Sequence, residues 1–145
     1  MRIGIPREVK QAERRVGLTP TSVRELTGRG HEVLLETEAG WGIGATDDHY
    51  RAAGATVTND VEKVWGIADM VVKVKEPQLV ERARLRADQI LFAYLHLAPD
   101  HDQTHDLIAS LASCIAYETV TDSSGGLPLL APMSRVAGRL AVQAG

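Results

Sequence analysis

Hydrophobic and polar positions along the chain follow two alternating patterns, one typical of strands and one typical of helices. Short, nearly continuous apolar runs predict buried strands at residues 2–5, 32–36, 55–58, 70–74, 89–95 and 113–117. Between them, capping residues followed by apolar residues at helical spacing predict helices. Strands separated by helices indicate an α/β fold, with an open, mostly parallel sheet and helices on both faces, Rossmann-like or flavodoxin-like.

The starts of the predicted helices are marked by residues that cap or open a helix. They are Thr19 with Pro20, Asp47 or Asp48, Asp60, the residues after Pro77, Asp100 and the region near Met133. In the helix over 100–111, the spacing predicts that Leu107, Ile108 and Leu111 face inward. Residues 127–131 are expected to be extended around their prolines.

A glycine-rich segment over residues 40–45 contains the pattern G-x-G-x-x-A after a predicted strand. A dinucleotide-binding fingerprint needs a tight turn that leads straight into a helix. Here the strand ends at Glu36, well before the first glycine, and the next helix begins near Asp47, after the last one. The glycines are therefore not joined directly to a strand and a helix, as the fingerprint requires. We therefore interpret this segment as a structural loop.

Composition narrows the classes of function. The chain has 145 residues, which suits one domain, and its net charge of −3 argues against nucleic-acid binding. Its single cysteine, Cys114, lies in an apolar strand and is interpreted as a structural thiol in a reducing cytoplasm. No apolar run approaches the roughly 20 residues that span a membrane. We expect neither nucleic acid nor a membrane as a partner.

Candidate chemistry lies where the predicted strands end, because ligands of open parallel sheets bind beyond the carboxyl ends of the strands. Lys75 and His96 each close a buried apolar run. A lysine there can donate to a carbonyl oxygen, and a histidine can transfer protons near neutral pH. The alternatives are a lysine that extends to solvent at the sheet edge and a histidine that caps a loop. Lys73 and Tyr94 share the strand parity of Lys75 and His96 and are expected to face the same sides.

Four further residues complete the candidates from the residues alone. Arg15 follows the first strand by a short loop and can hold a carboxylate through two parallel hydrogen bonds. Glu118 ends the last predicted strand. His101 and His105 have the i, i+4 spacing of half a zinc site, but no neighbouring ligand completes it, so no metal site is predicted.

Six segments of the chain, in the same order and spacing, resemble the N-terminal region of bacterial alanine dehydrogenases. They read GIPREVKQAERRVGLTP, GHEVLLETEAGWG, VVKVKEP, FAYLHLA, AYETV and LPLLAPMSRVAGRLAVQ. The resemblance implies interconversion of L-alanine with pyruvate and ammonia, NAD as the cofactor, and a homohexamer. The related transhydrogenases share fewer of the segments and are the alternative within the superfamily.

The resemblance also implies roles for individual residues. Arg15 looks like the arginine that holds the substrate carboxylate, and Lys75 like the catalytic lysine that binds the carbonyl oxygen. His96 resembles the catalytic acid/base. Tyr94 and Glu118 resemble substrate-binding residues of the cleft, and the pair Met133 and Ser134 resembles a contact with the cofactor.

By the same resemblance, residues 1–128 form the substrate domain and residues 129–145 begin the connection to an NAD-binding domain. That domain is expected to lie outside this chain, so the chain alone is expected to be inactive. A stand-alone module that binds small carboxylates, or one that drives assembly, is the alternative. Three residues depart from the family pattern: Ala12 and Gly17, expected to loosen the Arg15 loop, and Arg135, which reverses a charge.

Overall fold

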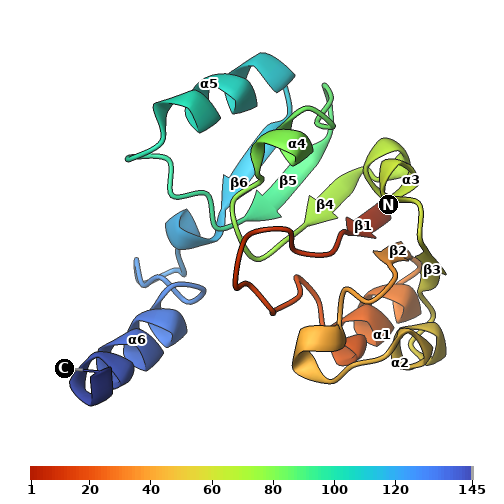
Figure 1. Ribbon diagram of the computed structural model, residues 1–145, viewed down its shortest axis with the longest axis horizontal. Coiled ribbons are helices and arrows are strands. Elements are labelled where there is room, and N and C mark those ends of the chain that lie inside the picture. The colour runs from red at the N-terminus through yellow and green to blue at the C-terminus, as the bar shows by residue number, and fades with distance from the viewer. Residues whose placement is uncertain (145) are drawn as a thin grey trace.

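Six parallel strands form one sheet within residues 1–144, the part of the chain that the computed structural model describes (Figure 1). They are β1 (Arg2–Ile5), β2 (Glu32–Glu36), β3 (Thr56–Thr58), β4 (Met70–Val72), β5 (Ile90–Ala93) and β6 (Ser113–Ala116). Their order is β3-β2-β1-β4-β5-β6, and every neighbouring pair is parallel. The predicted α/β fold with an open parallel sheet is confirmed, and the order is that of a doubly wound Rossmann sheet.

The order of strands changes direction between β1 and β4, which lie side by side at the centre of the sheet. Ile3 of β1 pairs with Val33 on one side and with Met70 on the other. In such sheets the segments that leave two adjacent strands at this point diverge, which opens a crevice beyond their carboxyl ends. Residues 6–18 follow β1 and residues 73–78 follow β4, so these two segments border the crevice.

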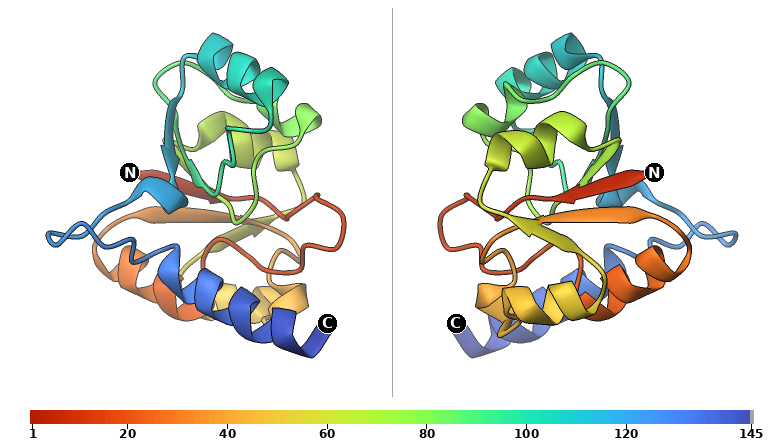
Figure 2. Two further views of the ribbon diagram at one scale, coloured as in Figure 1. Left: turned by 90° about the vertical axis from the view of Figure 1, so that its left-hand side faces the viewer. Right: turned by 90° about the vertical axis from the view of Figure 1, so that its right-hand side faces the viewer.

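Helices cover both faces of the sheet (Figure 2). Helices α1 (Pro20–Gly28) and α2 (Asp47–Ala52) lie on one face, and α3 (Val61–Ile67), α4 (Leu79–Arg82) and α5 (His101–Ser110) on the other. Two short 3₁₀ turns, η1 (Trp41–Ile43) and η2 (Tyr117–Thr119), follow β2 and β6. None of the helices described within residues 1–144 is long and apolar enough to cross a membrane.

Each face of the sheet has its own hydrophobic core, as the alternation of side chains along a strand requires. Ile5 of β1 packs with Val23 of α1 and Tyr50 of α2 in one cluster. Trp65 of α3 and Leu91 of β5 belong to the second cluster. These residues are almost fully buried, so the two cores hold the sheet rigid beneath the crevice.

The predicted helix starts are mostly confirmed. Thr19, Asp60 and Asp100 each accept a hydrogen bond from a backbone N–H in the first turn of α1, α3 and α5. The prediction for α2 was wrong, because Thr46 is its cap. The carboxylate of Asp47 is instead bonded to the Thr37 hydroxyl, at 2.6 Å, and to the backbone N–H of residue 38.

Two expectations about the second half of the chain were also wrong. Leu107 is buried, but the side chains of Ile108 and Leu111 are exposed, and Leu111 ends α5 in the left-handed conformation, at φ 58°. Residues 127–131 are not extended: the backbone turns at 128–130, because the N–H groups of Leu130 and Ala131 both donate to the carbonyl of Leu127.

The last helix, α6 (Ala131–Ala144), extends away from the sheet (Figure 1). It begins two residues before the predicted start at Met133, since Pro132 fits the first turn of a helix, where its missing N–H leaves no bond unmade. The predicted end at Gly145 lies outside the described residues.

The loop of residues 6–18, after β1, packs tightly against its surroundings. A Cβ atom on Gly17 would lie 2.5 Å from the carbonyl oxygen of Val72, and one on Gly42 would lie 2.7 Å from Arg14 Cβ. Gly17 therefore lets the loop approach the end of β4, contrary to the expectation that it loosens the loop. Ala12 differs: its φ of 64° is a left-handed conformation that costs a residue with a Cβ about 1–2 kcal/mol.

We predict that Ala12→Asn raises the free energy of unfolding by about 0.5–1 kcal/mol, because asparagine tolerates the left-handed conformation better than alanine. The control is Ala109→Asn, at an exposed position of α5, where the same exchange lowers helix propensity by about 0.5–0.7 kcal/mol. Urea unfolding of both variants measures the two changes. A destabilised Ala12→Asn variant would show that this backbone strain is absent.

Candidate functional site

The residues predicted for the site line two neighbouring cavities at the crevice between β1 and β4. Lys75 and His96 line a cavity of about 420 Å³, together with Glu76. Arg15 and Tyr94 line a second cavity of about 460 Å³. The rings of Tyr94 and His96 lie parallel, with centroids 6.0 Å apart, and so connect the two cavities. The structure thus brings together four of the five residues that were expected to bind or transform a substrate.

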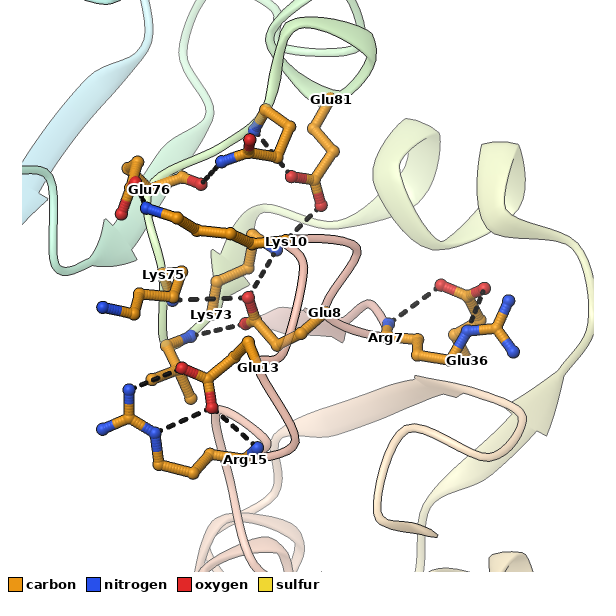
Figure 3. A network of polar contacts seen from close by, with 12 residues as sticks. Arg7, Glu8, Lys10, Glu13, Arg15, Glu36, Lys73, Lys75, Glu76 and Glu81 are labelled. Atoms are coloured by element: carbon orange, nitrogen blue, oxygen red, sulfur yellow. Dashed lines mark hydrogen bonds and ion pairs between the residues drawn. The ribbon is translucent and has the colours of Figure 1, made fainter. Parts of the chain in front are cut away.

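Arg15 is held in place by Glu13 (Figure 3). The Arg15 Nε donates to Glu13 Oε1 at 2.8 Å, and Nη2 donates to Oε2 at 2.5 Å. The hydrogen bond with Arg15 is the main reason that the pKa of Glu13 falls to about 2. Because Glu13 occupies one edge of the guanidinium, the opposite edge, with Nη1, is the one that can receive a further carboxylate.

His96 lies beside Glu76, which follows Lys75 in the chain. Its Nδ1 is 3.5 Å from Glu76 Oε2, and the other carboxylate oxygen of Glu76 forms an ion pair with Lys10. Burial raises the pKa of Glu76, but the hydrogen bond from Lys10 and the nearby positive charges outweigh burial, so the pKa lies below its ordinary value. A carboxylate in this place can orient an imidazole.

The backbone of His96 is held by Glu118. One carboxylate oxygen of Glu118 accepts hydrogen bonds from the N–H of His96, at 2.7 Å, and of Leu95, at 3.0 Å. These bonds hold His96 in a left-handed conformation, at φ 50°, so that its side chain turns out of the strand direction. The contacts give Glu118 a positioning role, and the expectation that it binds substrate stays a prediction.

Lys73 and Lys75 do not face the same side, contrary to the prediction. Strand β4 ends at Val72, so the alternation of a strand no longer applies to them. Lys75 is half-buried and lines the cavity with His96, whereas Lys73 is buried and pairs with Glu8 and Glu81. Figure 3 shows the two side chains pointing in different directions.

Aromatic side chains form the wall of the cavity beside Arg15. Tyr117 packs edge-to-face on Phe92 and on Tyr94, with ring centroids 4.2 and 4.9 Å apart. Burial raises the pKa of the Tyr117 hydroxyl above its ordinary value, so it stays protonated. The Tyr94 hydroxyl donates to the carbonyl of Leu129 at 2.5 Å. This wall offers an apolar surface next to a guanidinium, which suits a small carboxylate with an aliphatic end.

Met133 and Ser134, at the start of α6, lie on the open side of the site. Both are exposed, and Met133 Sδ accepts a long hydrogen bond from Arg15 Nη1 at 3.6 Å.

The glycine-rich segment is confirmed as a structural loop: it forms η1, and a Cβ on Gly40 would overlap Tyr50.

Other sequence candidates carry no site chemistry in the structure. Within residues 1–144, no three His, Cys, Asp or Glu side chains are placed to hold a metal ion. His101 and His105 are therefore not joined by a third ligand in this part of the chain. Burial raises the pKa of the Cys114 thiol, which keeps it protonated and unreactive.

The sequence analysis missed the glutamates of the site. Glu8, Glu13 and Glu76 contact Lys73, Arg15 and His96, respectively. Their signal in the sequence is weak: each lies in a charged segment directly after β1 or β4, beside basic residues that could equally be solvated. Only the folded arrangement shows which charges pair.

The fold and these side chains together define an α/β domain with basic side chains and an imidazole beyond the carboxyl ends of its central strands. A family model described as "Alanine dehydrogenase/PNT, N-terminal domain" matches residues 4–137, and the chain belongs to this family. The resemblance drawn from the six sequence segments is thereby confirmed.

Known relatives extend the comparison. The chain is 57% identical to the alanine dehydrogenase of Halomonas elongata and 54% identical to that of Mycobacterium tuberculosis. Both alignments cover 100% of this chain and 39% of the relative, so the chain spans about two fifths of the length of these proteins.

Solved structures agree with this comparison. A structure titled L-alanine dehydrogenase superposes with a TM-score of 0.94 at 50% identity, over 100% of this chain and 40% of that one. A transhydrogenase from Sinorhizobium meliloti gives a TM-score of 0.76 at 25% identity, over 81% of this chain and 35% of that one. The transhydrogenase is thus the more distant of these two neighbours.

We predict that Glu13 makes stability depend on pH. Its pKa is lower in the folded chain, about 2, than the ordinary value of 4.5, so its ion pair with Arg15 stabilises the fold fully above about pH 5 and is lost as the pH falls toward 2. The difference in unfolding free energy between the chain and Glu13→Gln should therefore shrink over this range. The control is Glu25→Gln, which changes an exposed glutamate of α1. A difference for Glu13→Gln that is the same at every pH would contradict the assignment.

Proposed function

We propose that this chain is the substrate-binding part of an NAD-dependent alanine dehydrogenase, which converts L-alanine, NAD⁺ and water to pyruvate, ammonia and NADH. The observation that carries the proposal is the placing of Lys75 and His96 in one cavity, with Arg15 at the next. Family membership supports it, since relatives that match the whole chain are named alanine dehydrogenases.

Each residue takes the part of the reaction that its surroundings favour. Arg15 binds the substrate carboxylate through the edge that Glu13 leaves open. Lys75 donates to the carbonyl oxygen of pyruvate and stabilises the negative charge that develops there. Tyr94 and the aromatic wall beside it orient the methyl end. Orientation of this kind lowers the barrier before any bond changes.

His96 moves protons to and from the carbinolamine that forms when ammonia adds to pyruvate. Glu76 Oε2 lies 3.5 Å from Nδ1, so we assign the exchange of the proton to Nε2. Glu118 supports this arrangement through the backbone, by its bonds to the N–H groups of residues 95 and 96. The imidazole is half exposed, so protons can be exchanged with solvent.

The residues present fit an NAD cofactor only in part. Met133 and Ser134 are exposed beside Arg15, where a nicotinamide held by another part of the protein can meet the substrate. When bound, the cofactor accepts the hydride from the substrate carbon. We assign residues 1–128 to the substrate domain, and residues 129–145 to the start of the connection to the NAD-binding domain. A homohexamer in the cytoplasm is part of the same proposal.

The first prediction concerns binding. We expect pyruvate to bind the 145-residue chain, and Arg15→Ala and Lys75→Ala each to weaken its affinity by about tenfold or more, because each removes one charged hydrogen bond. The matched control is Lys63→Ala, which removes a positive charge from the exposed face of α3. Isothermal titration calorimetry measures all four. Equal affinities for the chain and both site variants would show that the substrate binds elsewhere.

The second prediction concerns turnover. The 145-residue chain should not oxidise NADH in the presence of pyruvate and ammonia, because its candidate cofactor contacts are confined to Met133 and Ser134. Absorbance of NADH over time provides the measurement. Sustained turnover would overturn the assignment of cofactor binding to another part of the protein.

A further inference from the structure

Three charged side chains are buried together behind the site. The Lys73 ammonium lies 3.1 Å from Glu8 Oε2 and 2.8 Å from Glu81 Oε1, and the three side chains are only 1–2% exposed. Burial raises the pKa of Glu8, against the opposing effect of Lys73. A buried ion cluster is a poor source of stability, because removing the charges from water costs about as much as their attraction returns. Stability therefore does not account for the presence of these three charges behind the site.

Glu8 also holds the backbone that carries Lys75 (Figure 3). Glu8 Oε1 accepts the N–H of Val74 at 2.7 Å, and Oε2 accepts the N–H of Lys75 at 3.4 Å. On the other side of this segment, the β5 pairing continues, since the N–H of Tyr94 donates to the carbonyl of Val74 at 3.0 Å. Strand β1 has ended at Ile5, so its backbone no longer pairs with this segment. The Glu8 carboxylate instead accepts the N–H groups on that side.

The same carboxylate belongs to the loop that carries Arg15. Glu8 lies in the segment after β1, and Lys73 in the segment after β4, so their ion pair joins the two borders of the crevice. Lys73 cannot turn away from this pair, because Glu81 of α4 closes the other side of its ammonium. Glu8 thus links the loop of Arg15 to the segment of Lys75 through its bonds to Lys73, Val74 and Lys75.

We propose that Glu8, paired with Lys73, is the positioning residue that sets the separation of Arg15 from Lys75, and so fits the site to the adjacent carboxylate and carbonyl groups of a 2-oxo acid. This inference rests on the proposed function, in which those two groups hold the carboxylate and the neighbouring carbonyl oxygen of the substrate. Glu8 lies behind both groups and acts through them.

The test compares Glu8→Gln with Glu81→Gln in the 145-residue chain. Both remove one of the two carboxylates on Lys73 and leave the other, so the loss of stability should be similar. Glu8 also accepts the N–H groups of Val74 and Lys75, whereas Glu81 accepts the N–H of Gln78, farther along the same segment. In Glu8→Gln we expect the Val74 and Lys75 amides to exchange hydrogen about tenfold faster, and pyruvate affinity to fall about tenfold. In Glu81→Gln both changes should stay below about threefold.

Two measurements separate this inference from the proposed function. Amide hydrogen exchange by NMR needs no ligand and decides whether Glu8 holds the segment. Equal hydrogen exchange at Val74 and Lys75 in the two variants would overturn the positioning role. Equal pyruvate affinities in the two variants, despite different exchange, would overturn it as well. Failure of the unaltered chain to bind pyruvate would instead contradict the proposed function, while exchange still reports on Glu8. The variant Glu8→Asp, which keeps the charge, should recover part of the affinity.

Discussion

The parallel pairing of β1 with β4 is the constraint on which the site depends. The pairing puts the carboxyl ends of two strands, distant in the sequence, next to each other at the centre of the sheet. The segments that follow them then lie on either side of one crevice and carry Arg15 on one side and Lys75 on the other. Strand β5, the other neighbour of β4, adds His96 beside them. A sheet in which β1, β4 and β5 were not neighbours would separate these three residues.

Paired charges, more than apolar contacts, set the geometry within the crevice. Two of the groups that face a cavity have a glutamate beside them: Glu13 beside Arg15, and Glu76 beside His96. A guanidinium or imidazole held in this way has little conformational freedom left to lose on binding, so more of the attraction for substrate is realised. The aromatic wall supplies the apolar part of the surface without competing for these charges.

Much of the fold could be predicted from the sequence, because apolar runs and helix caps are local signals. All six strands were predicted, but the last three extend one or two residues too far where they approach the site, by two residues at β4 and β5. The errors arose where tertiary contacts override local patterns. Ile108 has helical spacing but lies on the outer face of α5, and Asp47 could cap α2 but is bonded to Thr37.

The candidate site was only partly predictable. Residues that end apolar runs, such as Lys75 and His96, could be found because a strand end has a known place in a parallel sheet. Glu8 could not, because its importance comes from a partner 65 positions away, Lys73, and charged segments alone do not show which groups pair. The two lysines after β4 were assigned to one side by strand parity, which failed because the strand ends before them.

The most direct test of the central claim is to map where pyruvate binds, by NMR chemical-shift changes of the backbone amides of the 145-residue chain. We expect the largest changes at residues 13–15, 73–76 and 94–96, the three segments that meet at the ends of β1, β4 and β5. Saturable changes confined to another surface, such as the cavity between α4 and α5 near Arg82 and Asp106, would contradict the assignment of the site.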